Sequence, residues 1–268
     1  MGMTVAHTLE ARYREVMQRI AAAAEKSGRP ANSILTVAVS KYAEFDDVRA
    51  LAALGHRDFG ESRVNQLMLR AATMEELAGR QKTMASVSAA RRPDGHHPPD
   101  ALRWHLIGHL QRNKVTKAIP TTRLIHSVDS LRLIEEIQGF AVRKDFDVDV
   151  LVQVNCSGEA SKFGCAVPAA QHLCEQIDLS GNIRIRGLMT MGPLTEDPAE
   201  TRATFNRCRD LYEDIVRRGI GGEKFNILSM GMTNDFELAI ECGSNCVRIG
   251  SAIFGTKADH IEDEEESD

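Results

Sequence analysis

Short apolar, β-branched segments alternate with amphipathic segments along most of the chain. The apolar segments predict strands at residues 35–40, 56–60, 104–107, 124–128, 149–155, 183–189, 225–229 and 247–249. Between them, apolar positions at helical spacing predict helices at residues 46–54, 64–77, 111–118, 130–142, 168–177, 199–217 and 234–241. Strands that alternate with helices indicate a parallel sheet with crossover helices, so we expect an α/β fold.

The number of units favours one architecture within that class. Eight strand–helix units in about 230 residues are typical of a single (β/α)8 TIM barrel. A doubly wound open sheet would show the same alternation, so the pattern alone leaves that alternative open. A further amphipathic segment at residues 4–27 predicts an extra N-terminal helix before the first strand.

Two segments do not follow this pattern. Residues 79–100 are polar and contain proline and glycine, which predicts a long surface loop. The adjacent His96 and His97 in this loop have no evident third ligand, so we expect no metal site there. Residues 257–268 are strongly acidic and predict a disordered tail. The predicted organisation is therefore one barrel over residues 1–256 and a tail over residues 257–268.

Composition excludes several classes of protein. The formal net charge is −5, so there is no general electrostatic attraction to nucleic acid. No apolar run reaches the length of a membrane span, and the N-terminus lacks the order of a signal peptide. The six cysteines form no CxxC pair, which suggests reduced thiols rather than a disulfide framework. We therefore expect a cytoplasmic protein without a nucleic-acid or membrane partner.

A lysine follows the first predicted strand. Lys41 would lie at the carboxyl end of that strand, where parallel barrels place their ligand chemistry. Burial at such a site favours the neutral amine, which can attack an aldehyde to form a Schiff base. The ordinary alternative is a lysine that is solvated or paired with a carboxylate.

The loops after the last two strands suggest a phosphate site. Ser229 and the nearby Gly231 lead into a predicted helix start, while Gly250 and Ser251 offer backbone N–H groups and a hydroxyl. Phosphate sites of such barrels commonly lie after the seventh and eighth strands. Either loop alone could be a simple turn, but together with Lys41 they suggest pyridoxal 5′-phosphate, a phosphorylated aldehyde.

An arginine in the last strand refines this interpretation. Arg248 lies in an apolar strand, where a guanidinium group is costly to bury without a partner. If it faced the pyridine nitrogen of the cofactor, its charge would oppose protonation of that nitrogen and disfavour carbanion chemistry. A salt bridge to Glu61 or Asp235 is the alternative.

Several motifs together resemble one protein family. They are VAVSK (37–41), FGE (59–61), WHLIGHLQRNK (104–114), HSVD (126–129), QVNCSGEASKFG (153–164), RGLMT (186–190), LSMGMT (228–233) and VRIGSAIFG (247–255). In order and spacing they resemble the YggS/PROSC pyridoxal phosphate homeostasis proteins, over about residues 9 to 256.

This resemblance implies a fold and a set of site residues. The fold would be a barrel like the N-terminal domain of alanine racemase. Lys41 would form the Schiff base, Arg248 would face the pyridine nitrogen, and Met230 would lie in the cofactor-binding motif. Ser229, Gly250 and Ser251 would hold the phosphate. Ser62 stands where the family usually has asparagine, which implies a weaker contact to the cofactor ring.

The resemblance also implies a role. The family is thought to buffer pyridoxal 5′-phosphate and deliver it to client enzymes without catalytic turnover, and we expect a monomer. The alternative is a PLP-dependent amino-acid racemase or lyase. Racemisation needs an acid/base group on each face of the cofactor, and the second group of alanine racemase is a tyrosine from another domain. The tyrosines here are Tyr13, Tyr42 and Tyr212, and we expect Tyr42 to project away from the site. The sequence therefore favours a cofactor-holding protein.

Overall fold

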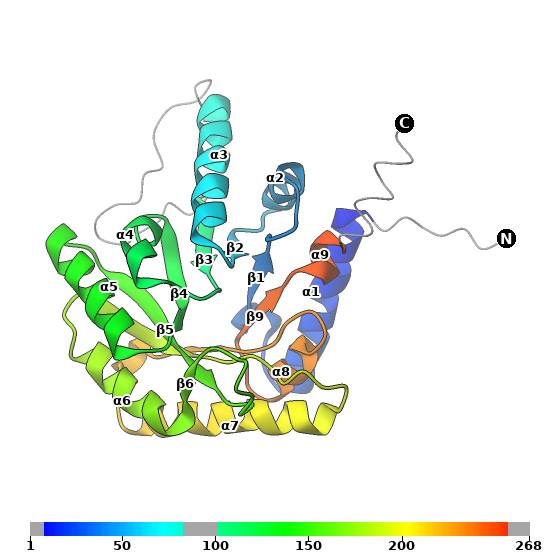
Figure 1. Cartoon of the computed structure of the whole chain (residues 1–268). Coiled ribbons are helices and arrows are strands. Elements are labelled where there is room, and N and C mark those ends of the chain that lie inside the picture. Colours follow the sequence, from blue (N-terminus) through cyan, green and yellow to red (C-terminus); the bar gives the residue numbers. More distant parts are fainter. Residues whose placement is uncertain (1–7, 83–100, 257–268) are drawn as a thin grey trace.

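A closed ring of parallel strands forms the centre of the molecule (Figure 1). The computed structural model describes residues 8–82 and 101–256. The ring runs through β1 (Leu35–Val39), β2 (Asp58–Glu61), β3 (Arg103–Leu106), β4 (Thr122–Val128), β5 (Val148–Asn155), β7 (Ile183–Met189), β8 (Ile227–Ser229) and β9 (Cys246–Ile249). Each strand pairs in parallel with the next, and β9 pairs with β1. The predicted (β/α)8 barrel is therefore confirmed, and the open-sheet alternative is wrong.

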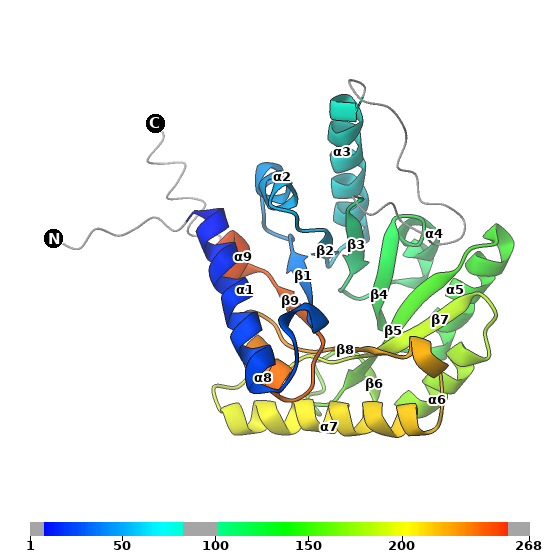
Figure 2. The ribbon, with the colours of Figure 1, turned by 180° about the vertical axis from the view of Figure 1, so that it is seen from behind.

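Helices surround the ring, as Figures 1 and 2 show. They are α1 (Leu9–Lys26), α2 (Phe45–Ala53), α3 (Val64–Lys82), α4 (Val115–Ala118), α5 (Leu131–Lys144), α6 (Val167–Asp178), α7 (Pro198–Arg217), α8 (Phe236–Glu241) and α9 (Ser251–Phe254). The extra N-terminal helix is confirmed as α1, which packs against α8 and α9. Its first turn is capped by Thr8, whose hydroxyl accepts a hydrogen bond from the Ala11 amide at 3.3 Å.

Some predicted boundaries are wrong. Helix α3 continues to Lys82, so residues 79–82 of the predicted surface loop are helical, and residues 83–100 lie outside the described part of the chain. The predicted tail, residues 257–268, also lies outside it. The two-residue strand β6 (Cys165–Ala166) and the four-residue α9 were not predicted, because such short segments show no periodicity.

The strands bury different side chains on their two faces. On β5, the four valines at alternate positions belong to the apolar core that the helices also line, whereas Asp149, Leu151 and Gln153 occupy the other face. Leu124 and Met189 join Leu151 in a separate small apolar cluster. Period-two alternation in a closed barrel puts these second-face residues inside the ring. The interior is therefore partly polar.

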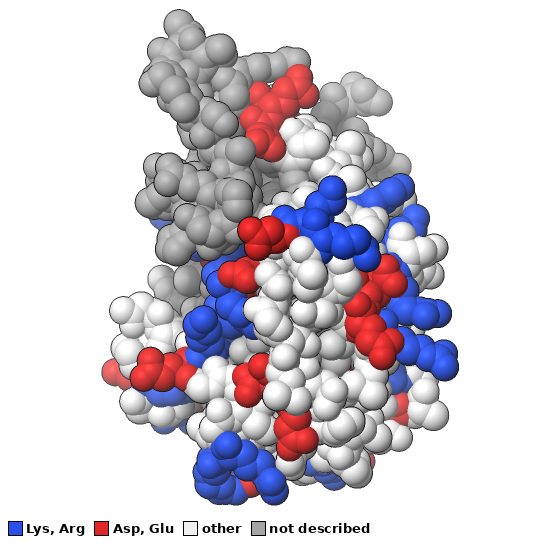
Figure 3. All heavy atoms as spheres, turned by 90° about the vertical axis from the view of Figure 1, so that its left-hand side faces the viewer, with Lys and Arg blue, Asp and Glu red and all other residues white. Residues whose placement is uncertain are grey.

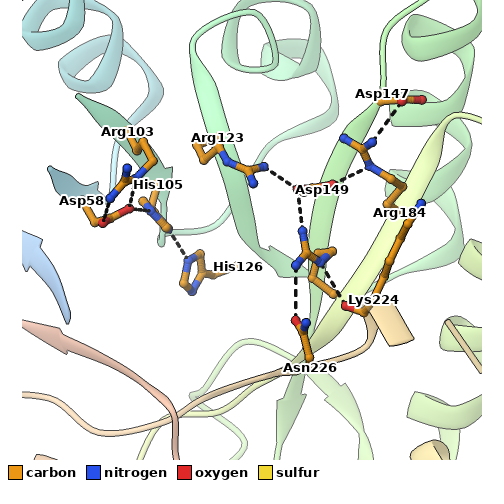
Figure 4. Close-up of polar contacts among 11 residues, drawn as sticks. Asp58, Arg103, His105, Arg123, His126, Asp147, Asp149, Arg184, Lys224 and Asn226 are labelled. Carbon is orange, nitrogen blue, oxygen red and sulfur yellow. Dashed lines mark hydrogen bonds and ion pairs between the residues drawn. The ribbon is translucent and has the colours of Figure 1, made fainter. Parts of the chain in front are cut away.

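One polar cluster lies at the amino ends of β4, β5 and β7 (Figure 4). Asp149 accepts hydrogen bonds from Arg184 at 2.7 Å and Arg186 at 3.0 Å, and also contacts Arg123. Burial alone would favour the neutral acid, but these three guanidinium groups outweigh it and lower the pKa of Asp149. This end of a barrel generally serves stability, so we interpret the cluster as structural.

The surface and the thiols fit the composition. Figure 3 shows acidic and basic side chains interspersed over one face, with no continuous field of either sign. All six cysteines are buried and unpaired, as expected for reduced thiols. Within the described residues, no helix combines the length and the apolar character needed to cross a membrane.

Candidate functional site

A cavity of about 1320 Å³ opens at the carboxyl ends of the strands. Its wall includes Lys41 after β1, Ser62 after β2, Arg248 in β9, and Gly250 and Ser251 after β9. The cavity also continues along α8, where its lining residues come from α1, α7 and α8. Ligand sites in parallel barrels lie at this end, so the cavity is the candidate site.

The turn after β1 determines where Lys41 lies. The Ser40 hydroxyl donates to Glu61 at 2.7 Å, and the Ala43 amide donates to the Ser40 carbonyl at 3.0 Å. This turn leaves Lys41 exposed at the cavity, with its Nζ 4.6 Å from the centre of the Tyr42 ring. The side chain of Lys41 is therefore exposed at the cavity that it lines. Tyr42 also lines the cavity, which contradicts the expectation that it projects elsewhere.

Glu61 is not the partner of Arg248. It is fully buried, and its carboxylate lies 2.8 Å from Nε of Arg70 and accepts the Ser40 hydrogen bond. Burial raises the pKa of Glu61, against the opposing effects of Ser40 and Arg70. The suggested Glu61–Arg248 salt bridge is therefore wrong.

Arg248 places a cation in the wall of the cavity while remaining almost entirely buried. Its side chain donates through one terminal nitrogen to the Ser229 hydroxyl at 2.6 Å and through the other to the Thr190 carbonyl at 2.9 Å. Among the described residues no carboxylate forms a salt bridge with it, although the nearby Asp235 opposes the lowering of its pKa by burial. An arginine without a carboxylate partner in a cavity wall is suited to an acceptor on a ligand.

The loops after β8 and β9 meet at Thr233. Its hydroxyl oxygen accepts from the Gly250 amide at 3.3 Å and from the Ser251 hydroxyl at 3.4 Å. Before Thr233, Gly231 adopts a φ of +92° and packs closely on α8, where a Cβ would lie 2.6 Å from that of Ala239, so this turn requires glycine. Hydroxyl and amide donors thus gather at one edge of the cavity, as an anion site requires.

An imidazole faces the cavity from the β3 loop. His109 stacks on Phe163, with 4.7 Å between ring centroids and 17° between planes. Its Nδ1 lies 3.7 Å from a carboxylate oxygen of Asp129. His109 thus places an imidazole in the wall of the cavity that Lys41 also lines.

The sequence matches one protein family along most of its length. The family model for the alanine racemase N-terminal domain matches residues 19–258. The chain belongs to this family. A pyridoxal phosphate homeostasis protein of Pseudomonas aeruginosa is 34% identical over 250 residues, covering 93% of this chain and 96% of that protein. This degree of similarity also makes the chain a member of the pyridoxal phosphate homeostasis proteins.

Solved structures agree with the family assignment. A Bifidobacterium adolescentis protein of unknown function is 36% identical, with a TM-score of 0.81 and coverage of 95% of this chain and 97% of that one. PipY of Synechococcus elongatus, solved with PLP bound, is 29% identical, with a TM-score of 0.69 and coverage of 90% and 100%. The alanine racemase-type barrel is therefore shared along almost the whole chain.

The predicted site residues of this family member separate into two groups. Lys41, Ser62, Arg248, Gly250 and Ser251 all line the cavity. The structure does not bring the other two to its wall. Ser229 and Met230 are fully buried, Ser229 behind Arg248 and Met230 in the apolar core between strands and helices.

Sequence reasoning missed other residues that shape the site. Thr233 was not singled out from the sequence, although a hydroxyl two residues after Gly231, just before a predicted helix, was a signal for it. Thr190 contributes a backbone carbonyl, which no residue type predicts. His126 contacts Ser229 from across the barrel, and a histidine within a predicted barrel strand was the available signal.

Proposed function

We propose that this protein holds pyridoxal 5′-phosphate in the cavity and acts in the homeostasis of that cofactor rather than in a reaction of its own. The observation that carries the proposal is the convergence of Lys41, Arg248 and the Thr233–Gly250–Ser251 donors on one cavity. The names of the relatives and the bound PLP in PipY support it.

The residues present fit the chemistry of the cofactor, which supplies an aldehyde that reacts reversibly with amines. Lys41 would hold it covalently through Nζ. Thr233, Gly250 and Ser251 would hold the phosphate with hydroxyl and amide donors, and Ser62 would contact the ring. We assign Arg248 to the pyridine nitrogen, because its permanent charge would keep that nitrogen unprotonated.

The arrangement favours storage over turnover. Racemisation needs two acid/base groups on opposite faces of the bound ligand. Lys41 and Tyr42 are consecutive residues in contact with each other, so they approach from the same loop. The exposed Lys41 is also accessible to an incoming amine, such as the lysine of a client enzyme. Delivery to PLP-dependent client enzymes and a monomeric state belong to the same proposal.

A PLP-dependent racemase or lyase is the second candidate. The His109–Asp129 pair favours it, because it places a further proton-transfer group in the cavity wall. Loss of the α-proton from amino acids, or release of keto acid, would support this alternative over storage.

Lys41→Ala tests the site directly. The unmodified protein, reconstituted with pyridoxal 5′-phosphate, should show a near-visible absorbance band that borohydride converts into a permanent adduct on the peptide containing Lys41. Lys41→Ala should lose that adduct and keep its fold, because the side chain is exposed and fills no core volume.

Lys26→Ala is the matched control. Lys26 is the other described lysine that lines the cavity, but its amine is paired with Glu241 at 2.5 Å. This variant should keep the adduct on Lys41. An adduct that survives in Lys41→Ala, or maps to Lys26, would contradict the assignment.

A further inference from the structure

A line of buried polar side chains runs inside the barrel behind Arg248. Nε2 of His105 lies 3.1 Å from Asp58, its Nδ1 lies 2.9 Å from Nε2 of His126, and Nδ1 of His126 lies 3.1 Å from the Ser229 hydroxyl, which accepts from Arg248 at 2.6 Å. All five residues are at most 7% exposed. Figure 4 shows the half from Asp58 to His126. We call these five residues the buried relay.

The two ends of the buried relay have opposite hydrogen-bonding character. Arg248 has only donors. Burial opposes ionisation of Asp58, but hydrogen bonds from Arg103 and His105 outweigh it, so the pKa of Asp58 is lowered and its carboxylate only accepts. With both rings neutral, the hydrogen bonds between these two ends must therefore all donate in the same direction, from Arg248 toward Asp58.

That direction determines both imidazole tautomers. If the two rings are neutral, the Ser229 hydroxyl donates to Nδ1 of His126, Nε2–H of His126 donates to Nδ1 of His105, and Nε2–H of His105 donates to Asp58. Any other neutral arrangement puts two donors or two acceptors against each other at one of these contacts. Burial lowers the pKa of His126 well below its ordinary value, which supports the neutral ring.

Ser229 then uses its full hydrogen-bonding capacity. Its hydrogen goes to His126, and one lone pair accepts from Arg248. The thiol of Cys246 also contacts Ser229, and burial raises the pKa of that thiol to about 11, so it keeps its proton and can donate to the second lone pair. In this arrangement the hydrogen and both lone pairs of the Ser229 hydroxyl each have a partner.

We propose that His105 and His126 are positioning residues for Arg248, held as neutral Nε2–H tautomers. By taking the Ser229 hydrogen, they turn its lone pair toward one guanidinium nitrogen, while the Thr190 carbonyl holds the other at 2.9 Å. The charge in the cavity wall is thereby fixed in place. The effect of this charge on a bound ligand rests on the proposed function. The tautomers of His105 and His126 do not depend on it.

The competing state carries one more proton. His105 would then donate from both ring nitrogens, to Asp58 and to His126, and His126 would donate from Nδ1 to Ser229. The Ser229 hydroxyl would then have to rotate so that its hydrogen no longer points to Nδ1 of His126. Besides Asp58 and His126, the charged or titratable groups near His105 are Arg103 and His56, which interact with the same carboxylate or its backbone.

Nuclear magnetic resonance of the ligand-free protein distinguishes the two states. Long-range ¹H–¹⁵N spectra of protein labelled in its histidines show which ring nitrogen carries hydrogen. His105→Phe and His126→Phe identify the signals by their loss. We expect both rings to be neutral and protonated only at Nε2. A hydrogen on Nδ1 of either ring, or a doubly protonated ring near neutral pH, would overturn the proposal.

A binding experiment tests the consequence for Arg248. Ser229→Ala and His126→Phe should weaken binding of pyridoxal 5′-phosphate about tenfold and shift its absorbance band, because the guanidinium group loses its fixed acceptor. Ser229→Ala changes little volume, so it keeps the test informative if His126→Phe does not fold.

His56→Phe is the matched control. His56 is also buried, but it contacts the Tyr13 hydroxyl and the backbone carbonyl of Asp58, and among the described contacts it forms no hydrogen bond with His105, His126, Ser229 or Arg248. It should leave affinity and spectrum unchanged. Equal affinities and spectra in all three variants would contradict the positioning role. If the unmodified protein does not bind the cofactor, the proposed function fails. The resonance experiment on the ligand-free protein still tests the assigned tautomers of His105 and His126.

Discussion

Ser62 is the site residue where this chain differs from the pattern its motifs resemble. Its side chain lines the cavity directly after β2, and its backbone packs closely against the β3 loop, where a Cβ on Gly108 would lie 2.2 Å from the Ser62 carbonyl oxygen. The backbone position is therefore fixed by its neighbour, while the residue as a whole lines the cavity.

Replacing Ser62 by asparagine should strengthen binding of pyridoxal 5′-phosphate. The longer amide can reach the ligand where the serine hydroxyl is too short, and one added hydrogen bond is worth about 1 kcal/mol, or roughly a fivefold lower Kd. Spectroscopic titration measures this, with Ser62→Ala as the control that shortens the side chain. Weaker binding by Ser62→Asn would mean that Ser62 makes the better contact.

At the level of single residues, the sequence located the site but not the direction of each side chain. Lys41 and Arg248 were predicted from their places at strand ends, and both line the cavity. Ser229 and Met230 lie in the same motif, yet β8 is only three residues long, too short to show which face each residue occupies. Ser229 points to Arg248 inside the barrel, a contact that depends on how β8 and β9 pair.

At the level of elements, the polar interior of the barrel could have been predicted in part. In β3, Arg103 and His105 alternate with Trp104 and Leu106, and only the latter two join the core between strands and helices. Strands of parallel sheets are usually apolar on both faces. Here polar side chains inside the ring satisfy one another across strands, and those partners are far apart in the sequence.

Asp149→Asn tests how much such an interior contact contributes to stability. The substitution keeps the size of the side chain but removes the charge that Arg123, Arg184 and Arg186 share. Because these arginines are partly exposed, we expect a loss of about 2 kcal/mol in the free energy of unfolding, below the range for a fully buried pair. Urea unfolding near neutral pH measures it.

The control for this prediction is a surface ion pair. Asp214→Asn removes a carboxylate that contacts Arg217 on the exposed face of α7 and should change stability by less than about 0.5 kcal/mol. A similarly small loss in Asp149→Asn would show that the three arginines are adequately solvated without the carboxylate.

At the level of the whole molecule, ring closure was the step that local patterns could not decide. It depends on the pairing of β1 with β9, in which Thr36 lies opposite Val247. Periodicity predicts that both segments are strands, but it contains no information on whether they meet. Closure of the sheet into a barrel was predicted from the resemblance of the motifs to a known family, and the structure confirms that closure.

The stability of the whole molecule should depend on pH through its buried imidazoles. Burial lowers the pKa of both His56 and His126 in the folded state below the ordinary value of 6.5. Below that value the unfolded chain binds protons that these folded rings do not, so acidification favours unfolding by up to about 1.4 kcal/mol per pH unit and ring. Glu61 and Asp235, whose pKa values burial raises, act in the opposite direction, because the folded state binds their protons more readily than the unfolded chain does.

His126→Phe isolates the contribution of one ring. Urea unfolding between about pH 7.5 and about pH 5 should show that the variant loses less stability on acidification than the unmodified protein. The two slopes of unfolding free energy against pH should differ by up to about 1.4 kcal/mol per pH unit, the contribution of one proton. The carboxyl groups contribute equally to both proteins, so the difference reports His126. Leu179→Ala, which alters an exposed side chain, should keep the original slope. Parallel pH profiles for His126→Phe and the unmodified protein would mean that His126 is protonated to the same extent before and after unfolding, and the neutral ring assigned to the folded state would be wrong.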